Sequence, residues 1–376
     1  MPWKEVRMTA LRKEFVSLVM RNGNISELCR RFNISRKTGY KWLGRYLANG
    51  EAGLLNRSRR PEHSPRKVTS EIEEAVVTLR REHPAWGGRK IRTYLFEHRF
   101  NQAPAASSIT GILRRNGLLN SDESSKHKAF KRFERGQPNE LWQMDFKGHV
   151  ACPEGRCHPL TILDDHSRYV VGLHPCLDER TETVQSVLLN TFRIYGLPNQ
   201  MLMDNGSPWG FNGTQPYTRL NVWLIRLGIL ISHSRPRHPQ TMGKDERFHR
   251  TLKAELIGDS IPWPNRQAKD RFEDYRFVYN HHRPHEALGM KVPASRYKIS
   301  NRTFPEALPS IEYAPQDFVR KVQQKGIVHF RGKEFRIPMA FMGQPVALRP
   351  NPDSDCIFDV FYIRQLVNHI DLSKPL

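Results

Sequence analysis

The sequence predicts a multidomain α+β protein with helical units at its N-terminus, a mixed α/β core and a small β-barrel at its C-terminus. Apolar residues recur at helical spacing through the first 120 residues. Strand-like and helical segments then alternate up to about residue 300, and short alternating segments separated by turns follow from Asp317. At 376 residues the chain is long enough for several domains, each with its own core.

Residues 1–50 predict a helix-turn-helix unit. Asn24 and Glu27 are spaced as a capping box, and Ser35 is the expected N-cap of a third helix. We expect this helix to turn Tyr40, Leu43 and Leu47 inward. Its cations then face outward, as in a helix that enters the major groove of DNA; they are Arg36, Lys37, Lys41 and Arg45. The alternative is a three-helix bundle with a solvated basic face.

Residues 51–69 predict a basic linker arm. The stretch from Arg57 to Lys67 combines five cations with two prolines, which disfavour a helix. An extended arm of this kind can lie in an A·T-rich minor groove, where the narrow width concentrates negative potential. We assign such contacts to Arg57, Arg59, Arg60 and Arg66. The alternative is a solvated linker without a partner.

Residues 70–120 predict a second helix-turn-helix unit. Candidate helices run from Glu71 to Glu82, from Arg89 to His98 and from Ser107 to Asn116, and the last is a candidate recognition helix. The residues that we expect to contact DNA are Arg89, Lys90, Ser107, Ser108, Arg114 and Arg115. Residues 121–138, rich in Ser, Lys and Arg, predict a linker to a core that spans residues 139–300.

Two short strands of this core are predicted to present a carboxylate. In one, Trp142, Met144 and Phe146 alternate with polar residues, so Asp145 points away from the apolar face. The other is an apolar run that stops at Asp204-Asn-Gly, which leaves Asp204 where the strand enters a turn. Buried isolated charges are costly, so carboxylates in such places are positioned to meet a cation.

A third carboxylate lies on a basic helix. Arg250 and Lys253 follow Glu246 at i+4 and i+7, on one face, whereas Phe248 and Leu252 lie on the opposite face. This arrangement suits a metal-binding acid beside a phosphodiester, with Arg250 and Lys253 as DNA contacts. The alternative is a solvated amphipathic helix with an i,i+4 ion pair.

Three carboxylates together suit Mg²⁺ or Mn²⁺, which prefer oxygen ligands. Two such ions in one site can activate an attacking oxygen and stabilise the leaving oxygen of an in-line phosphoryl displacement. We therefore expect two ions per active site, held by Asp145, Asp204 and Glu246. With 38 acidic residues in the chain, spacing alone does not identify them.

Three sequence blocks resemble the signatures of the DDE transposases of bacterial insertion sequences, relatives of retroviral integrases. They are Trp142-Gln-Met-Asp145, Asp204-Asn-Gly-Ser207 and His238-Pro-Gln-Thr-Met-Gly-Lys-Asp-Glu246-Arg-Phe-His-Arg-Thr-Leu252. The resemblance covers about residues 1–300. It implies a ribonuclease H-like core with Asp145, Asp204 and Glu246 as the metal-binding triad. It also implies that paired helix-turn-helix units read the terminal inverted repeats of a mobile element.

Two details of the third block leave an alternative open. Asp204 and Glu246 are 42 positions apart, longer than is usual in this family, and we assign the excess to a loop insertion at Trp209–Pro216. Asp245 is the rival third ligand, although it lies about 100° around the helix from Glu246. Asp165, in the segment that resembles the second and third strands of the family, is expected to be structural.

The C-terminal segment, residues 317–376, predicts the small β-barrel, and members of the family often end in a domain that contacts DNA or another subunit. Five irregularly spaced cysteines argue against a disulfide scaffold. Cys152, Cys157 and His158 suggest zinc, but a hairpin at Pro153-Glu-Gly155 explains the spacing without a metal.

Composition agrees with a nucleic-acid partner. The net charge is +22, and residues 1–140 hold 29 basic and 14 acidic side chains. A ribosome-associated or membrane-surface protein could share this total, but the chain has no long apolar run and no secretory pattern, so we expect the bacterial cytoplasm, at the nucleoid.

The sequence as a whole predicts a transposase that cleaves and joins double-stranded DNA. Acting on two ends, it would assemble as a homodimer or a higher oligomer and contact both terminal repeats and target DNA. A transposase-derived DNA-binding regulator without catalysis is the alternative from another class. A nuclease without strand transfer is a third possibility.

Overall fold

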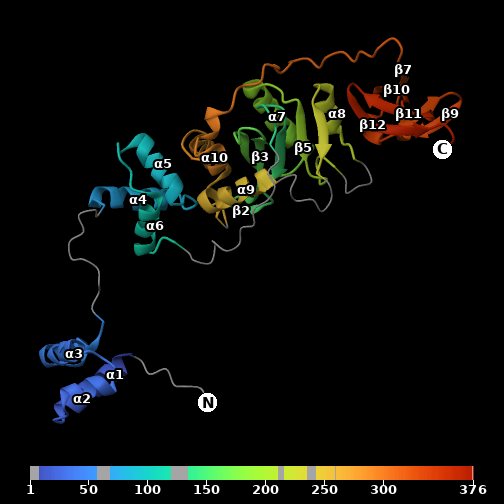
Figure 1. Cartoon of the computed structure of the whole chain (residues 1–376). Helices are drawn as coiled ribbons and strands as arrows, with labels where there is room; N and C mark the ends of the chain where they lie inside the picture. The colour runs from blue at the N-terminus through green and yellow to red at the C-terminus, as the bar shows by residue number, and fades with distance from the viewer. Residues whose placement is uncertain are drawn as a thin grey trace. The chain divides into compact units, whose positions relative to one another are not determined.

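The computed structural model describes residues 8–56, 68–119, 134–210, 216–234, 243–258, 260–374 and 376 (Figure 1). The chain divides into two compact units, Met1–Lys67 and Val68–Leu376. The arm cations Arg57, Arg59, Arg60 and Arg66 lie outside the described residues, as do most of the 121–138 linker, part of the Trp209–Pro216 loop and the start of the third signature block.

The first unit is a helical unit, as predicted. It contains α1 (Met8–Met20), α2 (Ile25–Arg31), α3 (Arg36–Asn49) and a short 3-10 helix η1 (Gly50–Leu54). Asn24 caps α2 by accepting from the backbone N–H groups of Ser26 and Glu27, and Ser35 caps α3 by accepting from Thr38 N–H. The helices close on a core whose buried members include Phe15, Val16, Leu28, Cys29 and Trp42.

The predicted inward face of α3 is wrong for Tyr40 and Leu47, whereas Leu43 packs against the core as predicted. Tyr40 is 56% exposed and Leu47 is 65% exposed, whereas Gly39 and Trp42 are buried. The helix is rotated because the Trp42 ring takes the inner position, with the Arg12 guanidinium 3.8 Å above its centroid. Both sets of residues recur at helical spacing, so periodicity alone did not decide between them.

The second unit begins with three helices, α4 (Ser70–Glu82), α5 (Gly88–His98) and α6 (Ala106–Arg115). They match the predicted helices to within one residue at each end, and they pack around Trp86, which is fully buried. The side of α5 that carries Arg89 and Tyr94 meets the loop after helix α10 (Asn265–His281). Arg89 lies 3.8 Å from a Glu286 carboxylate oxygen, and the rings of Tyr94 and His282 meet edge to face.

A mixed sheet forms the core, as predicted. Its strand order is β2-β3-β1-β5-β6, and β4 also pairs with β3. The pairings of β3 with β1, β2 and β4 are antiparallel, whereas β5 pairs in parallel with both β1 and β6. The strands are β1 (Trp142–Phe146), β2 (Val150–Cys152), β3 (Gly155–Asp164), β4 (Val170–Cys176), β5 (Gln200–Met203) and β6 (Leu230–His233).

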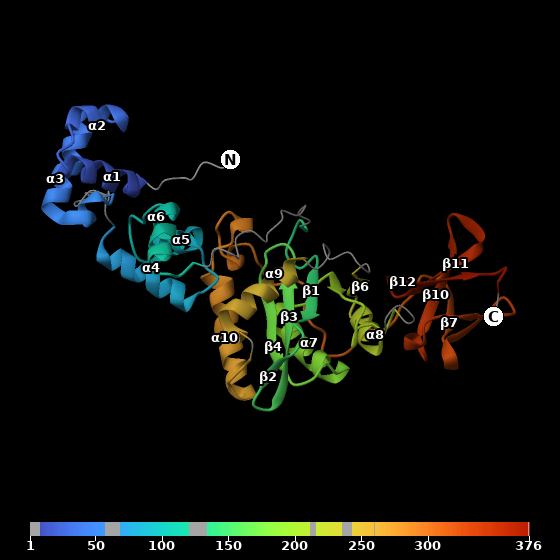
Figure 2. The same cartoon turned by 90° about the horizontal axis from the view of Figure 1, so that it is seen from below.

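Helices cover both faces of this sheet (Figure 2). One apolar cluster joins Trp142 and Ile162 to α7 (Thr181–Tyr195) and α8 (Arg219–Arg226). The other joins Leu163 and Val170 to α9 (Gly243–Leu252) and α10. A π-helical turn, Lys253–Ile257, extends α9, and short 3-10 turns at Glu286–Leu288 and Pro293–Ser295 follow α10.

The C-terminal region is a β domain, but the predicted β-barrel is not confirmed. Its four-stranded sheet has the order β12-β11-β10-β7, and β8 and β9 form a separate two-stranded sheet. Among the described residues β7 is an edge strand whose four residues are all exposed, so the sheets stay open. The strands are β7 (Phe318–Lys321), β8 (Ile327–Phe330), β9 (Lys333–Arg336), β10 (Pro345–Asn351), β11 (Ser354–Tyr362) and β12 (Gln365–Asp371), with 3-10 turns at Gln324–Gly326 and Met339–Phe341.

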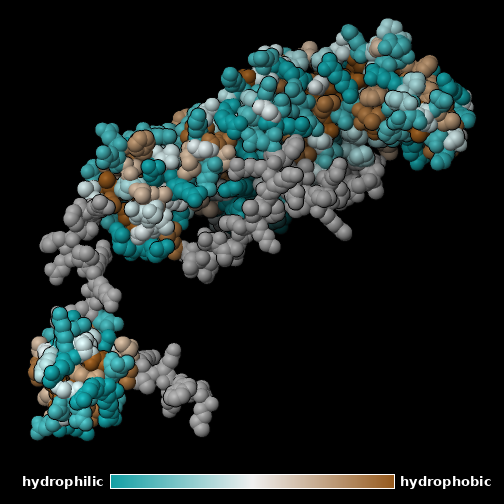
Figure 3. All heavy atoms as spheres, viewed as in Figure 1, coloured by the Kyte–Doolittle hydropathy of each residue, from teal (hydrophilic) through white to brown (hydrophobic). Residues whose placement is uncertain are grey.

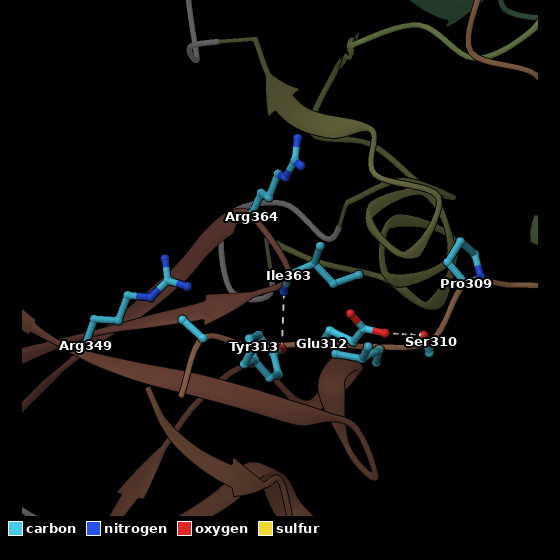
Figure 4. Close-up of a pocket in the computed structure, with 9 residues that line it drawn as sticks. Pro309, Ser310, Glu312, Tyr313, Arg349, Ile363 and Arg364 are labelled. Carbon is cyan, nitrogen blue, oxygen red and sulfur yellow. Dashed lines mark hydrogen bonds between the residues drawn. The ribbon is translucent and has the colours of Figure 1, made fainter. Parts of the chain in front are cut away.

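The segment that leads into this domain is tied to it by side chains. Tyr313 accepts from Ile363 N–H at 3.2 Å and donates to the Pro345 carbonyl at 2.8 Å (Figure 4). An open hollow of about 500 Å³ remains beside Glu312 and Arg364. Over the face seen in Figure 3, hydrophilic residues predominate among the described atoms, and no helix in the described ranges is long and apolar enough to span a membrane.

Candidate active site

Asp145 and Asp204 are placed side by side by strand register. β1 and β5 run parallel, and Gln143 pairs with Leu202. Two residues further along, Asp145 and Asp204 therefore leave the sheet at the same edge, where parallel strands bring their carboxyl ends together. Asp145 lies near the end of β1, and Asp204 directly follows β5.

The Asp204 carboxylate is held by the turn that follows it. Its Oδ1 accepts from Gly206 N–H at 2.9 Å and from the Trp209 indole N–H. A Cβ atom at Gly206 would lie 3.2 Å from both carboxylate oxygens, which favours glycine there. Trp209 is 1% exposed and stacks on Phe146. The sequence analysis did not identify this role of Trp209, although an indole five residues after an aspartate in a Gly- and Asn-rich turn was the available signal.

Glu246 lies in the first turns of α9 on the exposed face of that helix, together with Arg250 and Lys253. Phe248 and Leu252 are buried on the opposite face, as the helical spacing predicted. Burial and, after it, the negative charges of Asp204 and Glu246 together raise the pKa of Asp145 to about 7. The structure therefore brings all three predicted carboxylates within electrostatic range of one another.

These carboxylates fit a divalent cation. Hard oxygen donors are the ligands that Mg²⁺ and Mn²⁺ prefer. Partial burial and mutual repulsion both disfavour the charged form of Asp145, and a cation placed among the three groups would relieve both. The donor set and its electrostatics thus match the expected magnesium or manganese site.

A buried polar network that the sequence analysis missed lies beneath Asp145. The Thr161 hydroxyl, on β3 directly opposite Asp145, lies 3.0 Å from the Asp145 carbonyl oxygen and 3.0 Å from Asp245 Oδ1. It also lies 2.8 Å from His249 Nε2. Asp245 and His249 project inward from α9. We call Thr161, Asp245 and His249 the Thr161 network. One donor atom each from Asp145, Asp245 and His249 lie within 4.8 Å of one another.

Burial decides the charges in the Thr161 network. It raises the pKa of Asp245 well above the usual range of a carboxyl and lowers the pKa of His249 to about 3. His249 is therefore neutral near pH 7 and burial disfavours the charged form of Asp245, so their contact is a hydrogen-bonding arrangement rather than an ion pair. Asp245 and His249 share the buried stripe with Phe248 and Leu252, and this placement of polar residues on an apolar stripe was the signal in the sequence.

Asp165 has a structural environment, as expected. It is 1% exposed and accepts from the Arg135 N–H and the Gln143 amide, both at 2.8 Å. Lys244, in the first turn of α9, pairs with it at 2.6 Å. This buried ion pair fastens the start of α9 to the sheet and so helps to fix where Glu246 lies.

The residues predicted to bind DNA differ in how exposed their side chains are and in whether they pair with other residues of the chain. Arg36, Lys37 and Lys41 are exposed on α3, whereas Arg45 is half-buried with its guanidinium 5.1 Å from the Trp42 ring centroid. Ser107, Ser108 and Arg114 are exposed on α6, and Arg115 pairs with Glu73 at 3.2 Å.

Arg89 and Lys90 lie near acidic groups of the catalytic domain, although Arg89 is exposed. Arg89 pairs with Glu286, and burial lowers the pKa of Lys90 to about 8, near the charges of Arg283, Glu255 and Glu286. In this arrangement both side chains serve a contact within the second unit.

The segment of the alternative zinc site forms the predicted hairpin between β2 and β3. Cys152 pairs with Gly155 across the turn between β2 and β3, and Cys157 is buried. His158 Nδ1 lies 2.7 Å from Glu179 Oε1.

Family models match most of the chain. Two models described as "Integrase core domain" match residues 135–239 and 227–293. A "Helix-turn-helix domain" matches 11–62, a "Homeodomain-like domain" matches 38–113, and the "IS481 family transposase, C-terminal domain" matches 317–375.

Curated relatives come from insertion elements. Transposase InsD for insertion element IS2 of Escherichia coli is 29% identical over 69% of this chain and 91% of its own. A protein of insertion element IS476 of Xanthomonas euvesicatoria is 23% identical over 67% of this chain and 71% of its own.

The solved structures that resemble this chain include a simian T-cell lymphotropic virus intasome, which is 17% identical in sequence. The match covers 74% of this chain and 94% of the other, with a TM-score of 0.37. They also include the HTLV-2 integrase catalytic core domain in complex with magnesium (17% identity; 43% and 99%; TM-score 0.34).

The raised pKa of Asp145 predicts opposite pH effects on stability and on metal binding. Its stabilising contribution to the metal-free protein is full below the usual carboxyl pKa of 3.8 and is lost as the pH rises through about 7. Asp145→Asn should therefore raise the melting temperature of the metal-free protein at pH 8 and change it little at pH 4. Since binding requires the carboxylate, apparent Mg²⁺ affinity of the native protein should fall as the pH drops below about 7.

Thermal melts in a chelator and Mg²⁺ titrations across this pH range check both effects. Asp178→Asn is a control of opposite sign, because hydrogen bonds from Thr183 and Arg180 lower the pKa of Asp178. A loss of stability in Asp145→Asn at pH 8 would contradict a partly buried Asp145 whose charged form is destabilised by burial and by neighbouring carboxylates.

Proposed function

We propose that this chain binds the terminal inverted repeats of its own element. The chain belongs to the DDE transposases of insertion sequences and is thus a DNA-cleaving and DNA-joining enzyme. At the repeats it cleaves the 3′ ends and transfers them to target DNA. The observation that carries the proposal is the parallel register of β1 and β5, which sets Asp145 and Asp204 at one sheet edge within electrostatic range of Glu246.

In the proposed chemistry, Asp145, Asp204 and Glu246 hold the metal. Two divalent ions bound there would activate the attacking oxygen and stabilise the leaving one. In the first step a water oxygen forms a bond to the scissile phosphorus, the bond from phosphorus to the 3′ oxygen breaks, and a free 3′-hydroxyl results. In the second step the oxygen of that hydroxyl forms a bond to a phosphorus of the target strand, the bond from this phosphorus to the target's own 3′ oxygen breaks, and the target's 3′ oxygen leaves with the proton as a hydroxyl.

The remaining residues of the site orient the reacting groups. Gly206 and Trp209 fix the Asp204 carboxylate, and Lys244 fixes the start of α9. Arg250 and Lys253, on the face of α9 that carries Glu246, position the terminal phosphates. Their charges act where the polyanion approaches the carboxylates.

End recognition is assigned to the two helical units. The exposed residues of α3 and α6 contact the terminal repeats, and the cations of the 57–66 segment follow the minor groove. Because both ends of an element must be cut and joined together, the active assembly is at least a homodimer on DNA. We place its action in the bacterial cytoplasm, at the nucleoid, because its substrate is chromosomal DNA.

A strand-transfer assay tests this function. The purified full chain is incubated with labelled duplexes from the two flanks of its own gene, a target plasmid and Mg²⁺ or Mn²⁺. Joined products support the transposase. Cleaved ends without joining would identify a nuclease, and tight end binding without cleavage would identify a DNA-binding regulator.

A further inference from the structure

The outer face of α3 is basic. Between its cations it also carries Tyr40 and Gly44, and packing inside the unit does not account for either residue. Helix α3 contains four cations and no acidic residue. Lys37, Tyr40, Lys41, Gly44 and Leu47 are exposed on it. Residues 8–56 hold nine basic and three acidic side chains, so the charge of this face complements a polyanion.

Gly44 has no packing reason within its unit. A Cβ atom added there would meet nothing within 4 Å. At Gly39, on the inner face of the same helix, a Cβ would lie 2.6 Å from Cys29 Sγ and 3.0 Å from the Phe15 ring. Glycine is the least favourable residue inside a helix after proline. Close packing accounts for Gly39, whereas the bare backbone at Gly44 faces outward.

Tyr40 lies one helical turn before Gly44 on the same exposed face. It is 56% exposed, although an aromatic ring gains most from burial. Lys37 and Lys41 lie beside it at i−3 and i+1. An aromatic ring between two cations, next to a stretch of bare backbone, suits a surface that meets base edges between two phosphate backbones.

Helix α6 of the second unit repeats the feature. Gly111 is half-buried within it, and a Cβ there would meet only the end of the Arg115 side chain, at 3.9 Å. Two helices in separate units thus carry a glycine inside a helix that needs none for its own packing. The same external demand explains both.

We propose that Gly44 marks the closest approach of α3 to the floor of the major groove and that Tyr40 reads an adjacent base pair, through apolar contact with a thymine methyl group. Gly111 marks the corresponding approach of α6. This inference rests on the proposed binding of terminal repeats and names the residues that determine its specificity.

The test is fluorescence anisotropy of the full chain with two duplexes, one from a flank of its own gene and one with the same bases shuffled. Gly44→Ala should weaken binding to the flank duplex by about tenfold, the size of one lost base contact, and leave the shuffled duplex within about twofold. Its melting temperature should stay the same or rise, because alanine favours helix. Tyr40→Ala should show the same selective loss.

Ala10→Gly, on the exposed side of α1, is the matched control. It should lower the melting temperature without changing either affinity, which separates helix stability from DNA contact. Equal loss on both duplexes, or no loss, in Gly44→Ala would overturn this inference while leaving the proposed function intact. If the unmodified chain does not prefer the flank duplex, terminal-repeat binding fails as well.

Discussion

Glu246→Gln is expected to lose cleavage and joining by about a thousandfold or more, comparable with the removal of one group that stabilises charge in a transition state. An amide keeps the size of the side chain but supplies no negative charge to offset a dication. Glu246 is exposed on α9, so the substitution should leave the fold unchanged. DNA-end affinity should also stay within about twofold, because recognition is assigned to α3 and α6.

Single-turnover cleavage of a flank duplex, with anisotropy as the binding readout, measures this effect. Glu71→Gln is a matched control, since Glu71 is an exposed acid in the first turn of α4, outside the sheet that carries the site. Cleavage by Glu246→Gln at the rate of the unmodified chain would remove Glu246 from the metal site. Asp245 would then be the third ligand.

Asp245→Ala is expected to destabilise the protein by about 3 kcal/mol, because it removes one of the hydrogen-bond partners of the buried Thr161 hydroxyl, takes away the carboxyl beside His249 and opens a small cavity. Cleavage should fall as well, since Asp245 ties α9 to the strand pair that carries Asp145. Asp245→Asn should be much milder in both respects. Burial raises the pKa of Asp245 and so disfavours its charged form, which an amide does not need to replace, and an amide oxygen can still accept from Thr161.

Urea unfolding and cleavage kinetics distinguish this positioning role from metal ligation. A positioning role predicts that Asp245→Asn keeps cleavage within about tenfold and that Thr161→Ser, which keeps the hydroxyl, behaves like the unmodified chain, whereas Thr161→Val loses stability. If Asp245→Asn abolishes cleavage while remaining as stable as the unmodified chain, Asp245 binds the metal directly. The Thr161 network would then be part of the metal site.

Local patterns in the sequence predicted much of the fold. The helices α4, α5 and α6 match their predicted ranges to within a residue, and α10 matches the predicted Asn265–His281 helix. The family resemblance predicted the mixed sheet, and helical spacing predicted the exposed face of α9. The position of Asp145 follows from the alternation of apolar and polar residues along its strand, and that of Asp204 follows from an apolar run that stops at the carboxylate.

Features that depend on contacts between distant segments were not predictable. The Thr161 network joins residues 84 and 88 positions apart, and only strand register and helix packing bring them together. The rotation of α3 is set by the inner position of the Trp42 ring and by the close packing that Gly39 permits against Cys29 and Phe15, and helical periodicity specifies neither. Whether the C-terminal strands close into a barrel depends on the pairing of β7, an edge strand here.

The measurement that tests the central claim most directly is strand joining by Glu246→Gln and Asp245→Asn, run beside the unmodified chain with the flanks of its own gene and Mg²⁺. We predict joined products from the unmodified chain and from Asp245→Asn, and none from Glu246→Gln. Joined products from Glu246→Gln, or none from the unmodified chain under conditions in which it binds the flanks tightly, would contradict a transposase whose metal site is formed by Asp145, Asp204 and Glu246.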